Sequence, residues 1–311
     1  MRKTLTIAIP VYERGEFFRE ALESALHQTL PVNILVLDNA SQAFDFKQVI
    51  EEYKSPTIAY HRNPVNLGAH GNLNRCIELC PTPYVLILHD DDVLERDYVE
   101  FFSRNFEPAV DFYWGKASII DREGRVLRRE AVDYERFQKI EPWCTHNGSY
   151  QGAIMRREKA LELGMFDPTA RYFPDWDLNM KFMVSSETRF LPSFAVRYRI
   201  CEMSATARQS KDYRFHAYGR LQIKRNFHRA GLWQRYRAVR FTRLLPVPSL
   251  TLVFAFLPQL SPLKLRYFCA LITRSEAACG RNRITKIVVR LIGCRGVRLF
   301  GNLWRRLKPS P

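Results

Sequence analysis

The sequence predicts an α/β fold, a mostly parallel sheet flanked by helices, with a basic and mainly α-helical C-terminal extension. Three observations predict it. Short, wholly apolar segments alternate with amphipathic ones in the first third of the 311-residue chain. Polar residues directly follow three of the apolar segments. The charge is divided unevenly, which separates a domain at residues 1–200 from a region at 201–311.

The expected elements of the first domain follow from the period of their apolar residues. Strands are expected at Leu5–Ile9, Ile34–Leu37, Thr57–Tyr60 and Tyr84–Leu88, and the run at Ile34–Leu37 is wholly apolar, as in a buried parallel strand. Pro10 is expected to end the first of them. Helices are expected at Glu16–Gln28, Phe46–Tyr53 and Asn72–Leu79. Strands and helices that alternate at this spacing predict a parallel sheet with right-handed crossovers.

The polar residues at the strand ends are the candidates for a binding site, because ligands bind at the carboxyl ends of parallel strands. Tyr12-Glu13, residues 38–41 and residues 89–92 stand at these ends. Loop initiation and helix capping explain Asp38 and Ser41 well. They explain three consecutive aspartates poorly, since adjacent carboxylates repel unless a cation lies among them. Carboxylate oxygens suit Mg²⁺ or Mn²⁺, which also bind phosphates.

Several classes of protein and site are disfavoured by the sequence. Neither a Walker-type phosphate loop nor a GxGxxG motif follows the first strand, which argues against P-loop and dinucleotide-binding enzymes. The histidine and cysteine spacings match no common zinc signature. The first 18 residues turn polar too soon for a signal peptide. Seven cysteines, an odd number, fit a reducing compartment, so a cytoplasmic location is expected.

Five segments in order resemble the family 2, GT-A type nucleotide-sugar glycosyltransferases, over about residues 4–200. They are TIAIPVYER at 6–14, ILVLDNAS at 34–41, NLGAHGNLN at 66–74, LILHDDDVL at 86–94 and GMFDPTARYFPDWDLNMKF at 164–182. The last is similar to the family's acceptor-side segment, in which a GxFD phrase precedes an ED motif. The resemblance implies a GT-A fold and an inverting transfer of sugar from a nucleoside diphosphate.

The resemblance also implies roles for the residues at the strand ends. The nucleobase and ribose would be held by Pro10, Tyr12, Glu13, Asp38 and Asn39. Many members carry an aspartate at the position of Asn39 that pairs with the imide of uracil. Because an asparagine amide both donates and accepts, a uridine-linked or a deoxythymidine-linked donor is equally compatible.

The metal and the diphosphate are expected near the triple aspartate. The family's DxD motif reads His89-Asp90-Asp91 here, so its first aspartate is replaced by histidine. The resemblance assigns Asp91 to a divalent metal, Mn²⁺ or Mg²⁺, and Asp90 to the ribose or a metal-bound water. Gly68 lies in a Gly/Asn-rich stretch that could approach the diphosphate, although loop geometry alone would also explain its glycines.

The acceptor side is expected to be served by Asp175, which stands at the family's ED position as Pro174-Asp175. A sugar hydroxyl is a poor nucleophile, so a carboxylate must take its proton, and Asp175 is the candidate general base. Asp175 could also cap a helix over residues 176–184. Trp176 could stack on a sugar or pack in the core. The QxxRW motif of processive synthases is absent, which favours transfer of a single sugar.

The C-terminal region predicts a polyanionic partner. Residues 201–311 hold 23 Lys and Arg but 3 Asp and Glu, a balance of +20, whereas residues 1–200 hold 25 and 29. Residues 244–263 carry no charge but contain four prolines, which favours shallow membrane insertion over a spanning helix. We expect peripheral binding to the anionic cytoplasmic face of the cell membrane, with a glycan or lipid-linked saccharide acceptor of an envelope polysaccharide.

Three alternatives remain at this point. The basic region could be a solvated helical appendage that packs on the first domain or mediates dimerisation. It could bind nucleic acid, but no zinc-finger, RNP or helix-turn-helix signature supports this, so nucleic acid is not an expected partner. The chain could also be a catalytically inactive family member that serves as a scaffold, which the presence of Asp91 and Asp175 disfavours.

Overall fold

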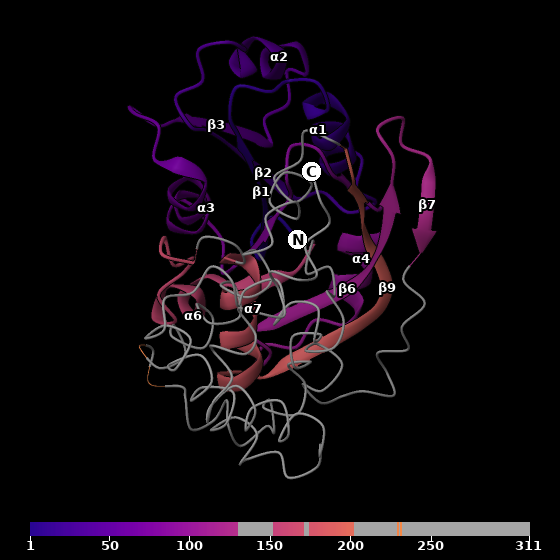
Figure 1. The fold of residues 1–311 in the computed structure, drawn as a ribbon. Helices are drawn as coiled ribbons and strands as arrows, with labels where there is room; N and C mark the ends of the chain where they lie inside the picture. The colour runs from indigo at the N-terminus through magenta and orange to yellow at the C-terminus, as the bar shows by residue number, and fades with distance from the viewer. Residues whose placement is uncertain (130–151, 171–173, 202–228, 230, 232–311) are drawn as a thin grey trace, which may run out of the picture. The chain divides into compact units, whose positions relative to one another are not determined.

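The computed structural model describes residues 1–129, 152–170, 174–201, 229 and 231, and Figure 1 shows their arrangement. The strands are β1 (Leu5–Val11), β2 (Asn33–Asp38), β3 (Ile58–Arg62), β4 (Tyr84–Ile87), β5 (Val93–Leu94), β6 (Phe112–Ile120), β7 (Val126–Arg129), β8 (Ile154–Arg156) and β9 (Thr188–Arg199). The helices are α1 (Phe18–Leu26), α2 (Phe46–Glu52), α3 (Gly68–Glu78), α4 (Tyr98–Arg104), α6 (Arg157–Glu162) and α7 (Pro174–Ser185).

These strands form one sheet in the order β3-β2-β1-β4-β8-β6-β9-β5, with β7 paired to β6. The first four run parallel, which confirms the α/β prediction for the N-terminal third. The other half is mixed: β8 is antiparallel to β4 and β6, β9 is parallel to β6, and β5 is antiparallel to β9. The mostly parallel sheet that the sequence predicted is confirmed, and the antiparallel pairs of this half are a feature that the sequence did not indicate.

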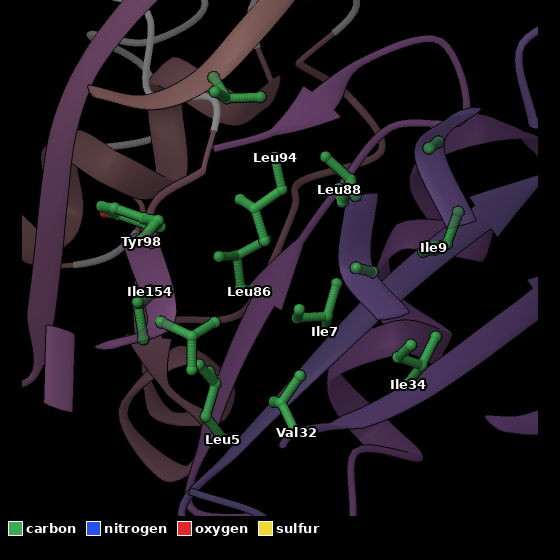
Figure 2. Close-up of a cluster of buried hydrophobic side chains, with 14 of the residues drawn as sticks. Leu5, Ile7, Ile9, Val32, Ile34, Leu86, Leu88, Leu94, Tyr98 and Ile154 are labelled. Carbon is green, nitrogen blue, oxygen red and sulfur yellow. The ribbon is translucent and has the colours of Figure 1, made fainter. Parts of the chain in front are cut away.

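The core lies along the parallel strands because their apolar runs are buried on both faces. Leu5 and Ile7–Ile9 of β1 have no exposed surface, as expected when helices cover both sides of a sheet. In α1 the side chains of Phe18, Ala21, Leu22 and Ala25 are buried, so the helix expected at Glu16–Gln28 turns one apolar face to the core. Figure 2 shows the cluster that residues of β1, β2, β4, β5 and α4 form. This core fixes the strand ends from which the candidate site is built.

Pro10 does not end β1, contrary to the prediction, and it pairs with Leu37 of β2. The carbonyl of Ala8 accepts a hydrogen bond from the amide of Leu88 at 2.9 Å. The backbone N–H and C=O groups of the even-numbered residues of β1 therefore point toward β4. Pro10 belongs to that set, and the pairing of β1 with β4 has its last partners at Ala8 and Ile87. The N–H that proline lacks would therefore point to the side where β4 has already left the sheet.

Helix α3 begins at Gly68, four residues before its expected start at Asn72. Gly68 and Gly71 were expected in a loop, and both lie in the helix. Gly68 has a φ of +73°, which glycine adopts without a steric penalty, and its amide donates to Asn66 Oδ1 at 2.7 Å. A Cβ at Gly71 would come within 2.6 Å of Leu67 Cβ. The two glycines thus allow the chain to turn sharply at the start of α3.

The C-terminal region expected at 201–311, with its uncharged stretch at 244–263, lies outside the described residues except for Cys201, Arg229 and Gly231. Its domain boundary and its membrane contact stay predictions. In the part of the chain that the structure describes, no helix is both long and apolar enough to cross a membrane.

Candidate active site

The candidate site lies where β1, β2 and β4 end, because β1 is the strand from which the sheet order runs in opposite directions. Such a switch point opens a crevice between the loops that follow the two neighbouring strands. Here β1 pairs with β2 as far as Val11 and Asp38, but with β4 only as far as Ala8 and Ile87. The structure therefore brings the loops after β1 and β2 and the aspartates after β4 to one edge, as the sequence predicted.

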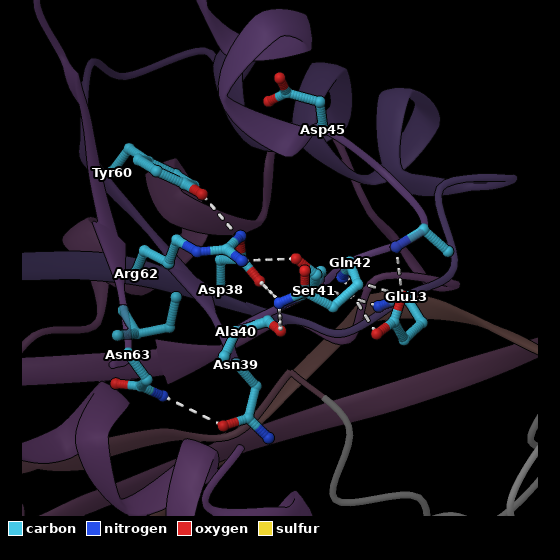
Figure 3. Close-up of polar contacts among 12 residues, drawn as sticks. Glu13, Asp38, Asn39, Ala40, Ser41, Gln42, Asp45, Tyr60, Arg62 and Asn63 are labelled. Carbon is cyan, nitrogen blue, oxygen red and sulfur yellow. Dashed lines mark hydrogen bonds and ion pairs between the residues drawn. The ribbon is translucent and has the colours of Figure 1, made fainter. Parts of the chain in front are cut away.

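Asp38 is fully buried and organises the loop after β2 (Figure 3). Its Oδ1 accepts from the amide of Ser41 at 2.9 Å, and its Oδ2 accepts from the Tyr60 hydroxyl at 2.7 Å and from Arg62 Nη1 at 2.6 Å. Burial by itself raises the pKa of Asp38, but these hydrogen bonds and the charge of Arg62 outweigh it and lower the pKa below its ordinary value. Asp38 is therefore ionised, and both of its oxygens hold protein groups.

Tyr60→Phe is expected to lower the free energy of unfolding by about 1.5 kcal/mol at pH 7, the value of one hydrogen bond to a charged group. A carboxyl whose pKa is lowered by folding stabilises the protein above its unfolded pKa of about 4, and this stability is lost as the pH falls through the folded pKa. The difference between variant and wild type should therefore shrink in acid. Urea unfolding at pH 7 and below pH 4 measures it.

Tyr53→Phe is the matched control for that experiment. The Tyr53 hydroxyl also donates to a carboxylate, Glu23 at 2.8 Å, but on the exposed surface. Its loss should cost well under 1 kcal/mol, because water replaces the bond. Equal losses for the two variants would show that the buried carboxylate of Asp38 is not what Tyr60 stabilises.

Asn39 is almost fully buried and joins the end of β2 to the start of α3. Its Oδ1 accepts from the amide of Leu67 at 2.9 Å and from Asn63 Nδ2 at 3.2 Å. Its Nδ2 donates to Asn66 Oδ1 at 2.8 Å and to the carbonyl of Gly68 at 3.3 Å. All four hydrogen bonds of this amide are thus made inside the protein, so a nucleobase would pair with it only by displacing one of them.

The loop after β1 is locked to the loop after β2 by Glu13, as Figure 3 shows. Its carboxylate accepts from the amides of Gln42, at 3.1 Å, and Ala43, at 2.7 Å, and its own amide donates to Ser41 Oγ at 3.0 Å. Glu13 has a φ of +59°, which is uncommon for a residue with a side chain and is held here by these bonds. The ring of Tyr12 beside it is 43% exposed and faces solvent.

The three aspartates after β4 are crowded and largely shielded from water. The side chains of Asp90 and Asp91 are only 11% and 15% exposed, and that of Asp92 is buried. Burial and the charge of Asp91 raise the pKa of Asp90 to about 7, although Arg14 opposes this. Burial also raises the pKa of Asp92 well above its ordinary value. Ionising all three carboxylates together is therefore unfavourable unless a positive charge lies among them.

The aspartates fit a divalent cation that is bound together with a phosphate. Their oxygens are hard donors, and Asp92 Oδ2 is buried without a hydrogen-bond partner in the part of the chain described here. Among those same residues, no three or more His, Cys, Asp and Glu side chains are grouped to enclose a metal. The donor set thus suits Mg²⁺ or Mn²⁺ held by one or two carboxylates, with waters and phosphate oxygens as the other ligands.

Arg199, the last residue of β9, anchors this loop and was not among the site residues predicted from the sequence. Its side chain is 1% exposed and forms an ion pair with Glu20 of α1. Its Nε donates to the carbonyl of Asp91 at 2.9 Å, and its backbone amide donates to Asp92 Oδ1 at 2.9 Å. Its Nη1 donates to the carbonyls of Asp121 and Arg122 at 3.1 and 2.7 Å. No motif surrounds it, and its partners are distant in sequence.

Asp175 lies in the first turn of α7 and is partly exposed. The expected helix is confirmed, but it begins at Pro174, a residue favoured at the first helical position, so Asp175 lies within the helix. Two residues on, the buried Asp177 pairs with Lys181 at 2.8 Å across one helical turn. The side chain of Trp176, and so its predicted role, lies outside the description.

The segment that precedes α7 is attached to helix α3 at two points. The amide of Asn74 in α3 accepts from the backbone N–H of Phe166 at 2.9 Å and donates to its carbonyl at 3.0 Å. His70 Nε2 lies 3.3 Å from the carbonyl of Ala170. Since Asn39 holds the start of α3, this helix connects the end of β2 to the chain that leads to Asp175.

Comparisons with known proteins agree with this architecture. The family model described as glycosyl transferase family 2 matches residues 6–164, just over half of the chain. An abequosyltransferase, RfbV of Salmonella typhimurium, is 30% identical over 115 residues, which cover 35% of this chain and 34% of that protein. Another curated relative, from Mycobacterium tuberculosis, is matched over 64% of its length, so the chain spans less than two thirds of either protein.

Two groups of solved structures share the fold. S. aureus TarS 1-349 in complex with UDP superposes with a TM-score of 0.65 at 13% identity, over 99% of this chain and 93% of that one. The mannosyltransferase PcManGT of Pyrobaculum calidifontis, in complex with GDP-Man and Mn²⁺, has a TM-score of 0.55 at 17% identity, over 98% and 88%. At these identities the likeness shows an α/β fold of the GT-A kind.

Proposed function

Because this chain belongs to glycosyl transferase family 2, a family of nucleotide-sugar-dependent enzymes, we propose that it transfers a single sugar with inversion. The donor in this proposal is a uridine- or deoxythymidine-diphosphate sugar, and the acceptor is a hydroxyl of a glycan or lipid-linked saccharide. The observation that carries it is the group of three adjacent, largely buried carboxylates at the switch point, Asp90, Asp91 and Asp92. Burial and mutual repulsion oppose the ionisation of all three together. A divalent cation would supply positive charge beside these carboxylates and would share it with the oxygens of a bound diphosphate.

On the donor side, Asp91 would hold a divalent cation and Asp90 the ribose or a metal-bound water. The cation would neutralise part of the negative charge that develops on the leaving diphosphate. Tyr12 offers an exposed ring at the same edge, suited to stacking on a base. Glu13, Asp38 and Asn39 would shape the nucleoside pocket through the loops that they hold.

On the acceptor side, Asp175 would take the proton from the attacking hydroxyl as it approaches the anomeric carbon. Attack from the side opposite the diphosphate inverts that carbon. The position of Asp175 in the first turn of α7 supports this role, because the Asp177–Lys181 pair braces that turn. Bound UDP in TarS and GDP-Man with Mn²⁺ in PcManGT support a nucleoside-diphosphate sugar as the donor.

Calorimetric titration with UDP, dTDP and GDP, with and without Mn²⁺, tests the proposal. Metal-dependent binding of UDP or dTDP is expected, and Asp91→Ala should weaken it by roughly 30-fold, or about 2 kcal/mol, because a metal ligand is lost. Asp97→Ala is the matched control, since this exposed aspartate lies six residues on. Tighter binding of GDP would correct the base, and binding of none of the three nucleotides would refute the donor site.

A further inference from the structure

Arg14, in the loop after β1, already places a positive charge between two of the aspartates. Its Nη2 lies 3.3 Å from Asp90 Oδ1 and 3.6 Å from Asp91 Oδ2. The guanidinium thus contacts the carboxylate assigned to the metal, and it does so from the loop after β1, whereas the aspartates follow the neighbouring strand β4. A divalent ion at Asp91 and this guanidinium would compete for the same oxygens.

The contact is loose compared with the other charged contacts of the site. Charge-assisted N–H···O bonds are typically about 2.7–2.9 Å long, and Arg62 binds Asp38 at 2.6 Å. Arg14 reaches both of its partners at longer distances, and its side chain is 39% exposed. Its backbone, in contrast, is fixed, because the amide of Arg14 donates to the carbonyl of Tyr12 at 2.7 Å and Glu13 is locked beside it. The side chain can therefore swing from a fixed point.

We propose that Arg14 occupies the metal's place at Asp90 and Asp91 in the free protein and moves onto the diphosphate when the metal and the donor bind. This inference rests on the proposed function. Two cations beside each other repel, so a metal alone must displace Arg14 without offering it a new partner. A nucleoside diphosphate removes that cost, because its oxygens match the fork of a guanidinium. Arg14 would thereby make the binding of metal and donor mutually dependent.

Mn²⁺ titration followed by electron paramagnetic resonance, which detects the free ion, tests this without any activity assay. In the absence of nucleotide, Arg14→Ala should bind Mn²⁺ at least tenfold more tightly than the wild type, or about 1.4 kcal/mol. With saturating UDP or dTDP the difference should vanish or reverse, because the variant has lost a diphosphate ligand. Arg14→Lys should stay near the wild type in the free protein, because it keeps the charge.

Arg19→Ala is the matched control, because it removes the same charge nearby and its guanidinium pairs with Glu52 instead. It should leave Mn²⁺ affinity within about twofold, as expected for an exposed charge screened by salt. Unchanged Mn²⁺ affinity in Arg14→Ala, or an equal gain in Arg19→Ala, would overturn the inference. Failure of every variant and of the wild type to bind a nucleoside diphosphate would instead refute the proposed function.

Discussion

Asp175→Asn is expected to slow transfer by roughly 10²–10⁴-fold, the usual contribution of a general base, and to leave nucleoside-diphosphate binding within about threefold. Asparagine keeps the size and shape of the side chain, but its amide cannot accept a proton. A loss in rate without a loss in binding identifies a group that acts in the transition state. The rate is measured as release of nucleoside diphosphate from the donor sugar, with water as the acceptor, since the same carboxylate would deprotonate water.

Glu162→Gln provides the comparison for that variant. Glu162 is an exposed carboxylate of α6, a helix in contact with α7, and it pairs with Lys159 at 2.7 Å. Its neutralisation should change the rate by less than about twofold, as for a surface ion pair. If Asp175→Asn retained the wild-type rate, or if Glu162→Gln lost as much, a base role for Asp175 would be excluded.

Arg199→Met is expected to lower the free energy of unfolding by about 3–5 kcal/mol, because losing this buried donor leaves several acceptors unsatisfied at roughly 1–3 kcal/mol each. The methionine fills part of the space, but the carbonyls of Asp91, Asp121 and Arg122 lose their donors. In a domain of this size the loss corresponds to a fall in melting temperature of roughly 10 °C. Calorimetry and urea unfolding measure both quantities.

The control for this position is Arg189→Met on the same strand. Arg189 pairs with Glu107 at 2.6 Å, but both side chains are at least 36% exposed, so its loss should cost under about 1 kcal/mol. Arg199→Lys restores the charge without the planar fork and should recover only part of the stability. Equal melting temperatures for Arg199→Met and the wild type would show that Arg199 does not hold the aspartate loop.

The N-terminal half of the sheet was predictable because each of its strands is indicated by a short local sequence pattern. Ile34–Leu37 and Tyr84–Leu88 are unbroken apolar runs between helical stripes, and the structure places strands at both. Because the carboxyl ends of parallel strands lie at one edge of a sheet, Asp38 and the aspartates 90–92 could be predicted to lie at the same edge. The other half depends on pairs distant in the chain, such as β6 with β9, and β9 shows no clean alternation in burial that a local pattern could reveal.

Within the candidate site, residue types were predictable and their partners were not. The sequence indicated that carboxylates would gather after β4, since this needs only topology. It did not show that Arg14 and Arg199 would reach them, because an arginine's partner depends on tertiary packing across 76 and 108 residues. In the same way, Asn39 was expected at the nucleobase, and the structure adds bonds to Leu67 and Asn66 that no local pattern indicates.

The placement of Pro10 has a consequence for how the chain assembles. Each step of a parallel ladder needs an N–H donor on one strand and a C=O acceptor on the other. Pro10 has no backbone N–H to donate toward β4, and the ladder between β1 and β4 ends just before it, at Ala8 and Ile87. His89 and Asp90 are thereby kept out of the sheet while the neighbouring β1–β2 ladder closes through Val11. A single proline on the neighbouring strand β1 thus helps to keep the aspartates in a loop after β4.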